Sequence, residues 1–360
     1  MLSKIIYNFA NKNNMYVSIG SAEKFEYLRK PLKNISPKLK SFVENDIEKR
    51  INPSLTLEGA KSIISCAVSY NIINIKTKKD NKIRGIISNA AIGEDYHNIL
   101  KNKMKSLCDE ISLFTPFEYK IFTDTGPLCD REVARRSNLG FIGKNTSLII
   151  PNVGGKIFLG YIITNLELEY NNIEIKNNCH NCNKCIKVCP TGALSNTFYP
   201  EKCISYLTQS KELLSYEDMK NINKQLYGCD LCQNVCPYNK KSENSVDIDI
   251  CFPQIEKILN MSNKEFKTQF GFTAAGWRGK KIIQRNAVAI LGNYKILKSL
   301  DILNECLKDK RELIRNTAVR SITNLGFKEG IEILETAYIN ETNENIKKDI
   351  KYGIKMLKGE

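Results

Sequence analysis

The sequence contains no apolar run long enough to cross a membrane. Runs such as Ile157 to Thr164 are far too short for a transmembrane helix. The amino terminus, Met-Leu-Ser-Lys-Ile-Ile-Tyr-Asn, lacks the long apolar core of a secretory signal peptide. These absences predict a cytoplasmic protein without a membrane segment.

A disulfide framework is also not indicated, although cysteine is plentiful. The chain has 13 cysteines, an odd number, and no signal peptide directs them to an oxidising compartment. The thiols are therefore expected to stay reduced.

The cysteine spacing is typical of iron-sulfur proteins. One run reads C-x2-C-x2-C-x3-C-P, with which bacterial ferredoxins bind one [4Fe-4S] cube through three cysteines and reach a second cube with the fourth. Its cysteines are Cys179, Cys182, Cys185 and Cys189. A second run supplies Cys229, Cys232 and Cys236, and Cys203 lies between the runs. The thiolates that two cubes need are therefore present.

Structural zinc is the alternative, because zinc sites also use paired C-x2-C elements. A third cysteine followed by Cys-Pro does not fit a tetrahedral four-ligand site, so iron-sulfur is favoured. By analogy with two-cluster ferredoxins, one cube is expected on Cys179, Cys182, Cys185 and Cys236. The other is expected on Cys189, Cys203, Cys229 and Cys232. His180 lies inside the first run, where we expect a spacer rather than a ligand.

The length of the chain indicates how many domains it can form, and its charge indicates which partners it can bind. The 360 residues exceed what a bare ferredoxin needs and leave room for two or three domains. Lys and Arg number 54 against 39 acids, a net charge of +15, which favours a polyanionic partner such as nucleic acid. A biased composition with charge scattered over a solvated surface is the alternative.

The hydrophobic pattern changes along the chain. Residues 1–60 are predicted to be helical and polar. Strands are expected at 60–70, 119–124 and 156–165, and residues 93–100 are expected to open a helix that runs to about Leu113. Strands alternating with helices indicate an α/β (α+β) layer. We therefore predict an α/β domain at 1–170, a ferredoxin-like two-cluster domain at 171–245 and an all-helical domain at 246–360.

The helical domain contains a possible repeat. Residues 281–292 and 315–326 superpose glycine on glycine at a 34-residue offset. Two such copies predict a short HEAT-like solenoid, an architecture that presents a surface to a macromolecule. An ordinary helical cap on the cluster domain is the alternative.

Two roles are possible for Asp130 from its place in the sequence. It follows the turn Thr125-Gly126-Pro127, where a carboxyl can face a pocket, and it lies at the start of a predicted helix. To donate a proton at neutral pH, its pKa must be raised by desolvation. The alternative is that Asp130 is only a helix N-cap.

The chain resembles the epoxyqueuosine reductase family over nearly its full length. The strings that carry the resemblance are Glu48-Lys-Arg-Ile-Asn-Pro, Gly93-Glu-Asp-Tyr-His, Asp124-Thr-Gly-Pro-Leu-Cys-Asp-Arg-Glu, Gly143-Lys-Asn, Cys203-Ile-Ser-Tyr-Leu-Thr-Gln, Tyr227-Gly-Cys-Asp-Leu-Cys-Gln and Trp277-Arg-Gly-Lys-Lys-Ile-Ile-Gln-Arg-Asn-Ala. The resemblance implies reductive removal of the epoxide oxygen from epoxyqueuosine at the tRNA wobble position, which gives queuosine. It also implies a cobalamin next to the nearer cube.

The resemblance further implies site residues. Asp130 matches the family's acid, and the expected cofactor contacts are Arg50, Ser88, Asp130, Lys144, Asn145, Gly154 and Asn165. Close relatives can carry cysteine where this chain has Ser88. The expected tRNA contacts are Arg278, Lys280, Lys281 and Arg285.

A histidine-ligated corrinoid is not expected. Asp95-x-His97 matches the start of the D-x-H-x-x-G signature of enzymes that ligate cobalt with histidine, but Leu100 stands where glycine is required. The resemblance instead implies a base-off cobalamin without a histidine ligand, and the expected partners are tRNA and an external electron donor. The chain is expected to be a monomer.

Two other functions remain open from the sequence. One is a non-enzymatic electron-transfer protein, although the string around Asp130 favours an enzyme because an electron carrier needs no acid. The other is a reductive dehalogenase-like enzyme, which would normally need an export signal.

Overall fold

The computed structural model describes residues 1–70, 81–240 and 248–360, which form two compact units. Within these residues, unit 1 comprises 1–70, 94–201 and 231–240, and unit 2 comprises 81–93, 202–230 and 248–360. Each unit is therefore assembled from three segments. The predicted consecutive domains do not coincide with these units, because the segment with the cysteine runs is divided between them.

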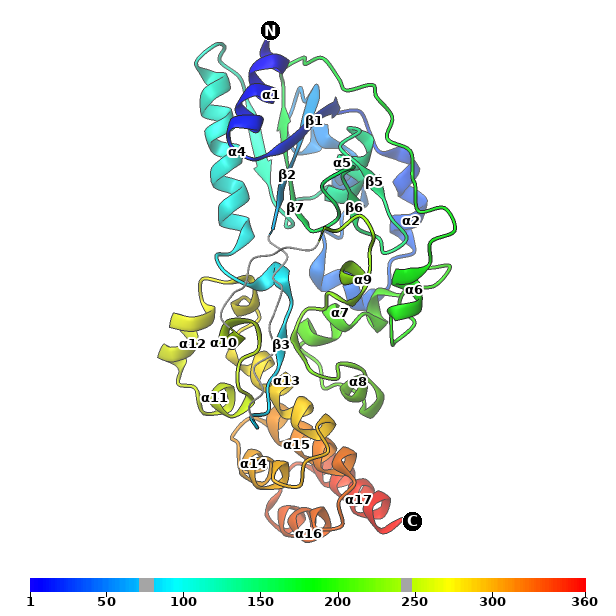
Figure 1. Ribbon diagram of the computed structural model, residues 1–360, viewed down its shortest axis with the longest axis vertical. Helices are drawn as coiled ribbons and strands as arrows, with labels where there is room; N and C mark the ends of the chain where they lie inside the picture. The colour runs from blue at the N-terminus through cyan, green and yellow to red at the C-terminus, as the bar shows by residue number, and fades with distance from the viewer. Residues whose placement is uncertain (71–80, 241–247) are drawn as a thin grey trace. The chain divides into compact units, whose positions relative to one another are not determined.

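Unit 1 is built on a four-stranded antiparallel sheet with strand order β1-β2-β7-β4 (Figure 1). Its strands are β1 (Tyr16–Ser21), β2 (Ser62–Ser69), β7 (Ile157–Thr164) and β4 (Tyr119–Phe122). The central strands β2 and β7 are rich in β-branched and aromatic residues and are largely buried, which favours extended backbone. The three strands predicted from the sequence are thereby confirmed.

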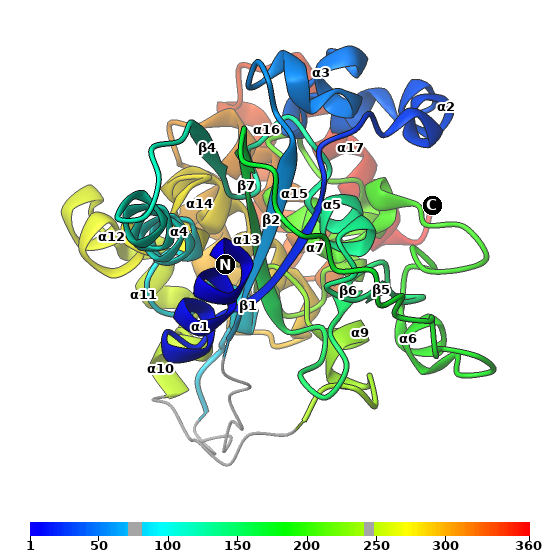
Figure 2. The same ribbon diagram turned by 90° about the horizontal axis from the view of Figure 1, so that it is seen from above.

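Helices cover both faces of this sheet (Figure 2). Helices α1 (Leu2–Lys12) and α4 (Tyr96–Ser112) pack on one face, where Ile64 is buried. Helix α5 (Asp130–Arg136) packs on the other face, where Ile63 is buried. Successive side chains of a strand point to opposite faces, so these two neighbouring isoleucines belong to different cores.

The sequence did not predict strand β1. Residues 1–60 were expected to be helical, but Tyr16–Ser21 pairs along β2 as an edge strand. Gly20 allows its close approach to the end of α5, because a Cβ there would lie 2.7 Å from the Ser137 Oγ. Tertiary pairing overrides the weak local pattern here.

The rest of unit 1 consists of short elements. They are α2 (Arg29–Lys33), α3 (Ile47–Ile51), α6 (Lys184–Val188), α9 (Leu231–Asn234) and the hairpin of β5 (Phe141–Ile142) with β6 (Leu148–Ile149). Short 3-10 helices lie at Glu26–Leu28, Pro37–Phe42, Pro53–Leu55 and Pro200–Lys202. The predicted ferredoxin run falls in α6, which contains Cys185, and in the loops around it, and part of the second run falls in α9.

Unit 2 is mainly helical. A short parallel pair of strands, β3 (Ile86–Ile87) and β8 (Gln225–Tyr227), lies beside helices from two segments of the chain. The helices are α7 (Ile204–Gln209), α8 (Tyr216–Asn221), α10 (Ile248–Cys251), α11 (Ile255–Asn260), α12 (Asn263–Phe270), α13 (Lys280–Asn293), α14 (Ser299–Cys306), α15 (Glu312–Leu325), α16 (Gly330–Asn340) and α17 (Glu344–Lys358). Short 3-10 helices lie at Asn89–Ala91 and Ala274–Gly276.

The two glycines that align in the predicted repeat have different structural reasons. Gly292 lies inside α13, where a Cβ would be 2.8 Å from the Ser321 Cα of α15. Gly326 ends α15 in the left-handed conformation, with φ of 78°. The HEAT-like character of α13 to α17 therefore stays a prediction. Among the described residues, no helix combines the length and the apolar character that crossing a membrane requires.

Candidate active site

The turn after β4 brings two carboxylates together. Asp124 has a left-handed backbone, with φ of 57°, which Asp tolerates better than most residues. Gly126 has no room for a side chain, because a Cβ would lie 2.2 Å from the Tyr161 hydroxyl. The same hydroxyl accepts the Leu128 N–H at 3.1 Å. Strand β7 thus fixes the path of the chain into α5, which begins at Asp130.

The surroundings of the Asp130 carboxyl fix its position and raise its pKa. Its Oδ2 accepts the backbone N–H of Asp124 at 2.9 Å. Burial raises the pKa of Asp130 to about 7, and the charge of Asp124 adds to the increase, while the Asp124 N–H and Arg131 oppose it. The N-cap interpretation is wrong, because Cys129 occupies the N-cap position of α5.

His97 lies between the carboxylates of Asp95 and Asp124. Its Nδ1 is 2.7 Å from Asp95 Oδ1, and its Nε2 is 3.7 Å from Asp124 Oδ2. Asp124, and then Asp95, raises the pKa of His97 to about 9, although burial opposes the increase. His97, and then the Tyr96 hydroxyl that donates to Asp124 at 2.9 Å, lowers the pKa of Asp124. At neutral pH this pair is an imidazolium and a carboxylate.

A pocket in unit 1 brings together the four thiols predicted to share one cube. These are Cys179, Cys182, Cys185 and Cys236. Lys144 and Lys184 also line the pocket. The Lys144 Nζ donates to the His180 carbonyl at 2.7 Å and to the Asn183 Oδ1 at 2.8 Å, so it holds the loop that carries the first thiols. Positive charge here suits the negative charge of thiolate ligands.

Gly154 lets a second loop approach this pocket. Its φ is +110°, and a Cβ would lie 2.5 Å from the Asn239 Oδ1. That oxygen accepts the Gly155 N–H at 2.7 Å, and the Asn239 amide donates to the Gln233 carbonyl at 2.8 Å. The structure thus supplies a packing reason for a glycine close to the loop that follows Cys236.

The thiols predicted for the second cube come from both units. Cys189 and Cys232 lie in unit 1, whereas Cys203 and Cys229 lie in unit 2. Cys203 is the N-cap residue of α7, and Cys229 closely follows β8. None of the eight predicted ligands is in a disulfide.

Two of the predicted corrinoid contacts have unpaired buried atoms. Within the described part of the chain, Arg50 Nε and Asn145 Nδ2 have no hydrogen-bond partner. Since buried donors are usually bonded, these two atoms fit a bound group with acceptor atoms, such as the side-chain amides of a corrinoid. Ser88 is buried in unit 2, where a Cβ on Gly228 would lie 2.4 Å from its Oγ.

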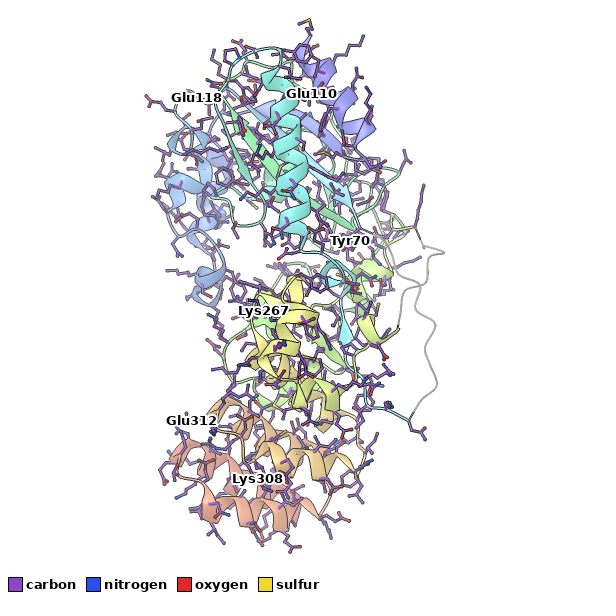
Figure 3. The ribbon with its side chains drawn as sticks, turned by 90° about the vertical axis from the view of Figure 1, so that its left-hand side faces the viewer. Tyr70, Glu110, Glu118, Lys267, Lys308 and Glu312 are labelled. Carbon is purple, nitrogen blue, oxygen red and sulfur yellow. The ribbon has the colours of Figure 1, made fainter. Side chains whose placement is uncertain are left out.

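Asn165, another predicted cofactor contact, also bonds within the sheet. Its Oδ1 accepts the Glu118 N–H at 3.0 Å, so its side chain joins the end of β7 to the start of β4. Asp124 follows the opposite end of β4. Figure 3 shows Glu118 and Tyr70 at opposite ends of the sheet. Asn165 therefore has a structural contact, and its predicted contact with the cofactor stays a prediction.

Arg285 is a correction to the predicted set of tRNA contacts. Its side chain is 0% exposed and donates to the backbone carbonyls of Leu207, Ser210 and Glu212 at 2.9 to 3.0 Å. A guanidinium enclosed in this way cannot reach a phosphate. The prediction that Arg285 contacts tRNA is therefore wrong.

The other predicted tRNA contacts lie nearer the surface. Lys281 is exposed, and the partly exposed Lys280 donates to the Met261 carbonyl at 3.2 Å. The Arg278 guanidinium lies 3.7 Å from the ring centre of Trp277, whose surface is 55% exposed. These side chains can present positive charge and an aromatic face to a polyanion.

Sequence reasoning missed Asp124 as a site residue and considered His97 only as a cobalt ligand. The sequence could have indicated both residues, because each lies in a sequence motif that carries the family resemblance. The sequence could not show that α4 and the turn after β4 meet.

Unit 1 contains a carboxyl with a raised pKa and a pocket lined by four thiols. These two features are typical of an iron-sulfur oxidoreductase. The family model described as a 4Fe-4S double cluster binding domain matches residues 178–239. The model described as epoxyqueuosine reductase QueG, DUF1730, matches residues 50–125.

Known proteins of this kind match nearly the whole chain. The epoxyqueuosine reductase of Bacillus subtilis is 40% identical over 332 residues, which cover 89% of this chain and 86% of that protein. A crystal structure of epoxyqueuosine reductase with an epoxyqueuosine-modified tRNA-Tyr stem loop has a TM-score of 0.92 and 36% identity, with 99% of both chains covered. A Bacillus subtilis epoxyqueuosine reductase with its catalytic aspartate loop swung out of the active site has a TM-score of 0.91 and 36% identity, over 99% of this chain and 98% of that one. The chain belongs to the epoxyqueuosine reductase family.

Proposed function

We propose that this enzyme removes the epoxide oxygen of epoxyqueuosine in the anticodon loop of tRNA and so forms queuosine, with Asp130 as the proton donor. The observation that carries the proposal is the Asp130 carboxyl, which accepts the Asp124 N–H at 2.9 Å and whose pKa is raised by burial, as a proton donor at neutral pH requires. The similar enzyme solved with an epoxyqueuosine-modified stem loop supports the choice of substrate.

The balance of the reaction requires an acid. Converting an epoxide to an alkene consumes two electrons and two protons for each water released, because the oxygen leaves with both of its bonds to carbon broken. The departing oxygen is a poor leaving group as an alkoxide, so protonation by Asp130 lowers the barrier. Asp130 must then regain a proton before the next turnover.

The electrons are expected to pass through two [4Fe-4S] clusters. The pocket lined by Cys179, Cys182, Cys185 and Cys236 supports the first ligand set. For the second set we retain Cys189, Cys203, Cys229 and Cys232. An external donor would supply the electrons.

The second ligand set is tested by removing one thiol. In Cys203→Ala, iron should fall from about eight to about four atoms per chain, with one low-temperature EPR signal lost. Cys306→Ala, which removes a cysteine of α14 outside both sets, is the matched control and should keep all the iron. Full iron in Cys203→Ala would show that another residue, such as Cys251, completes the count.

The residues present fit a base-off cobalamin. Bound cobalamin would supply the reducing electrons to the substrate. Arg50 and Asn145 would hold it through their unpaired donors, with Ser88, Lys144, Gly154 and Asn165 among the remaining predicted contacts. His97 is unsuited to ligate cobalt, because both ring nitrogens face carboxylates and its pKa of about 9 keeps it protonated.

The function is tested with the reconstituted enzyme and an epoxyqueuosine-containing anticodon stem-loop. With iron and cobalamin loaded and a reductant present, mass spectrometry should detect the loss of one oxygen from the modified base. Loaded protein that leaves the base unchanged would contradict the proposal. A non-enzymatic electron carrier would give that negative result, and so would an enzyme that acts only on organohalides.

A further inference from the structure

Asp124 connects the catalytic acid to His97. Its backbone N–H bonds to the Asp130 carboxyl at 2.9 Å, while its own carboxylate accepts from Tyr96 at 2.9 Å. The His97 Nε2 lies 3.7 Å from the same carboxylate, which is an ion pair rather than a hydrogen bond. One residue of the turn thus contacts both the acid and the start of α4.

The start of α4 is itself well anchored. Asp95 is the N-cap residue of α4 and accepts the His97 N–H at 3.0 Å with the oxygen that also contacts the imidazole. The Tyr96 ring stacks on His97, with ring centres 4.2 Å apart, and on Phe158 of β7, with centres 4.5 Å apart. His97 is therefore held in one orientation toward Asp124.

We infer that Asp124 and His97 are positioning residues for the Asp130 acid: their ion pair fixes the turn whose N–H orients the Asp130 carboxyl, and the Asp124 carboxylate places a negative charge beside that acid. This inference rests on the proposed function, because it assigns the pair a role in the same proton donation. Asp124 and His97 need not touch the substrate.

The charges around Asp130 favour this assignment. Asp124 is the acidic neighbour whose charge raises the pKa of Asp130, and Arg131 opposes it. The Arg131 guanidinium is partly engaged elsewhere, since it donates to the Thr146 carbonyl at 2.6 Å. Tyr161 of β7 faces Asp130 as a neutral phenol, because burial and then the Asp130 charge raise its pKa. Cys129 and Arg50 lie next to each other beside α5.

The ion pair has a second, purely structural interpretation. It could serve only to attach α4 to the turn after β4, without influence on the acid. In that case removing the charge would lower stability but would leave the protonation of Asp130 unchanged. Titration of single groups separates the two interpretations.

The first experiment is a histidine titration of the full chain. The sequence contains only two histidines, His97 and His180, so NMR of protein with 15N-labelled histidine gives two sets of signals. His180→Gln assigns them. His97 should remain protonated through neutral pH and titrate near 9. A His97 that titrates near its ordinary value would overturn the ion pair and the inference with it.

The second experiment measures Asp130 directly. The infrared band of its protonated carboxyl is identified by its loss in Asp130→Asn and is followed against pH. In Asp124→Asn, which keeps the shape and tolerates the left-handed backbone, the titration midpoint of Asp130 should fall. A midpoint equal to that of the native enzyme would contradict the inference.

Turnover gives the third measurement. In Asp124→Asn the loss of kcat should grow as pH rises and should largely disappear at low pH, where Asp130 is protonated again. His97→Gln leaves the Asp124 charge in place, so its loss should be the same at every pH. Asp109→Asn removes an exposed carboxylate that pairs with Lys105 on α4 and should change neither profile. If the loss of kcat in Asp124→Asn does not vary with pH, the charge of Asp124 does not influence the protonation of Asp130.

Failure of the inference can be told apart from failure of the proposed function. The two titrations need no substrate, cluster or cobalamin. Undiminished turnover in Asp130→Asn would refute the proton donor itself, whatever the titrations show.

Discussion

Arg285 in unit 2 is a fully buried ionisable group and Asp130 in unit 1 is a partly buried one, and their surroundings differ. Arg285 donates to three carbonyls and remains charged, although burial lowers its pKa to about 10. Asp130 accepts one backbone N–H from Asp124 and lies beside a like charge. The Arg285 guanidinium is bonded to backbone carbonyls and serves the fold, whereas an acid with a raised pKa is available for chemistry.

Arg285 also shows how unit 2 supports its predicted cluster ligands. Two of its carbonyl partners, Leu207 and Ser210, lie at the carboxyl end of α7, where a positive charge is favourable. The neighbouring Asn286 donates to the Thr208 carbonyl of α7 at 2.8 Å and the Leu226 carbonyl of β8 at 2.9 Å. Helix α13 thus holds together the segments that carry Cys203 and Cys229.

The largest expected effect is on turnover at the acid. Asp130→Asn should lower kcat by about 10²- to 10⁴-fold at neutral pH, because the departing oxygen loses its proton donor. In the native enzyme, kcat should fall as pH rises through about 7, since only protonated Asp130 is active. Measurement of kcat against pH with iron and cobalamin loading held equal checks both expectations.

The stability of Asp130→Asn distinguishes this acid from a helix cap. Because the folded-state pKa of Asp130 is raised, the native acid costs stability as pH rises from about 4 to 7. The asparagine variant should therefore melt no lower than the native protein at pH 8. A lower melting temperature there would indicate that Asp130 stabilises α5 after all.

The next effect concerns the fold around Arg285. Arg285→Ala should lower the free energy of unfolding by about 3 kcal/mol, because three buried carbonyls lose their donor and a cavity remains. Urea denaturation measures this change. Lys281→Ala, an exposed position on the same helix, should change stability by less than about 0.5 kcal/mol. Equal effects of the two substitutions would contradict the comparison.

A smaller effect is expected on tRNA affinity. Lys280→Glu/Lys281→Glu should weaken binding of the anticodon stem-loop and make the salt dependence of log Kd shallower by about 1 for each lost phosphate contact. Lys101→Glu/Lys105→Glu on α4 makes the same change of charge elsewhere and should bind normally. If both variants bind alike across a salt series, the start of α13 is not a tRNA contact.

The smallest effect is on stability at His97. Because the folded-state pKa of His97 is raised, its ion pair stabilises the protein fully below the ordinary histidine pKa and less as pH rises through about 9. His97→Gln should cost on the order of 1 kcal/mol at pH 6, after allowance for partial exposure. The cost should vanish by pH 10, as thermal denaturation at both pH values can show.

Much of the molecule could be predicted from the sequence because the signals were local. The central strands are apolar runs, and the helix that begins near Tyr96 has an N-cap residue before it. The cysteine spacing indicated iron-sulfur chemistry, since thiolates at short separations are what a cube requires. The family resemblance carried by the residues around Asp130 predicted the acid, and that role stays a prediction.

The remaining features depend on contacts between distant parts of the chain. Strand β1 forms because β2 offers a partner, although its own pattern is weak. Asp124 and His97 are 27 positions apart in sequence, and only the packing of α4 on the sheet brings them together.

Residue type alone determined the charge of Arg285 and of Lys281, and both looked equally fit to contact a phosphate. Tertiary structure decided between them. One side of α13 is buried against the carbonyl ends of α7, and there a guanidinium replaces the hydrogen bonds that the helix end lacks. The sequence determines which groups a residue offers, but burial and neighbouring charges determine whether that group titrates, binds or holds the fold together.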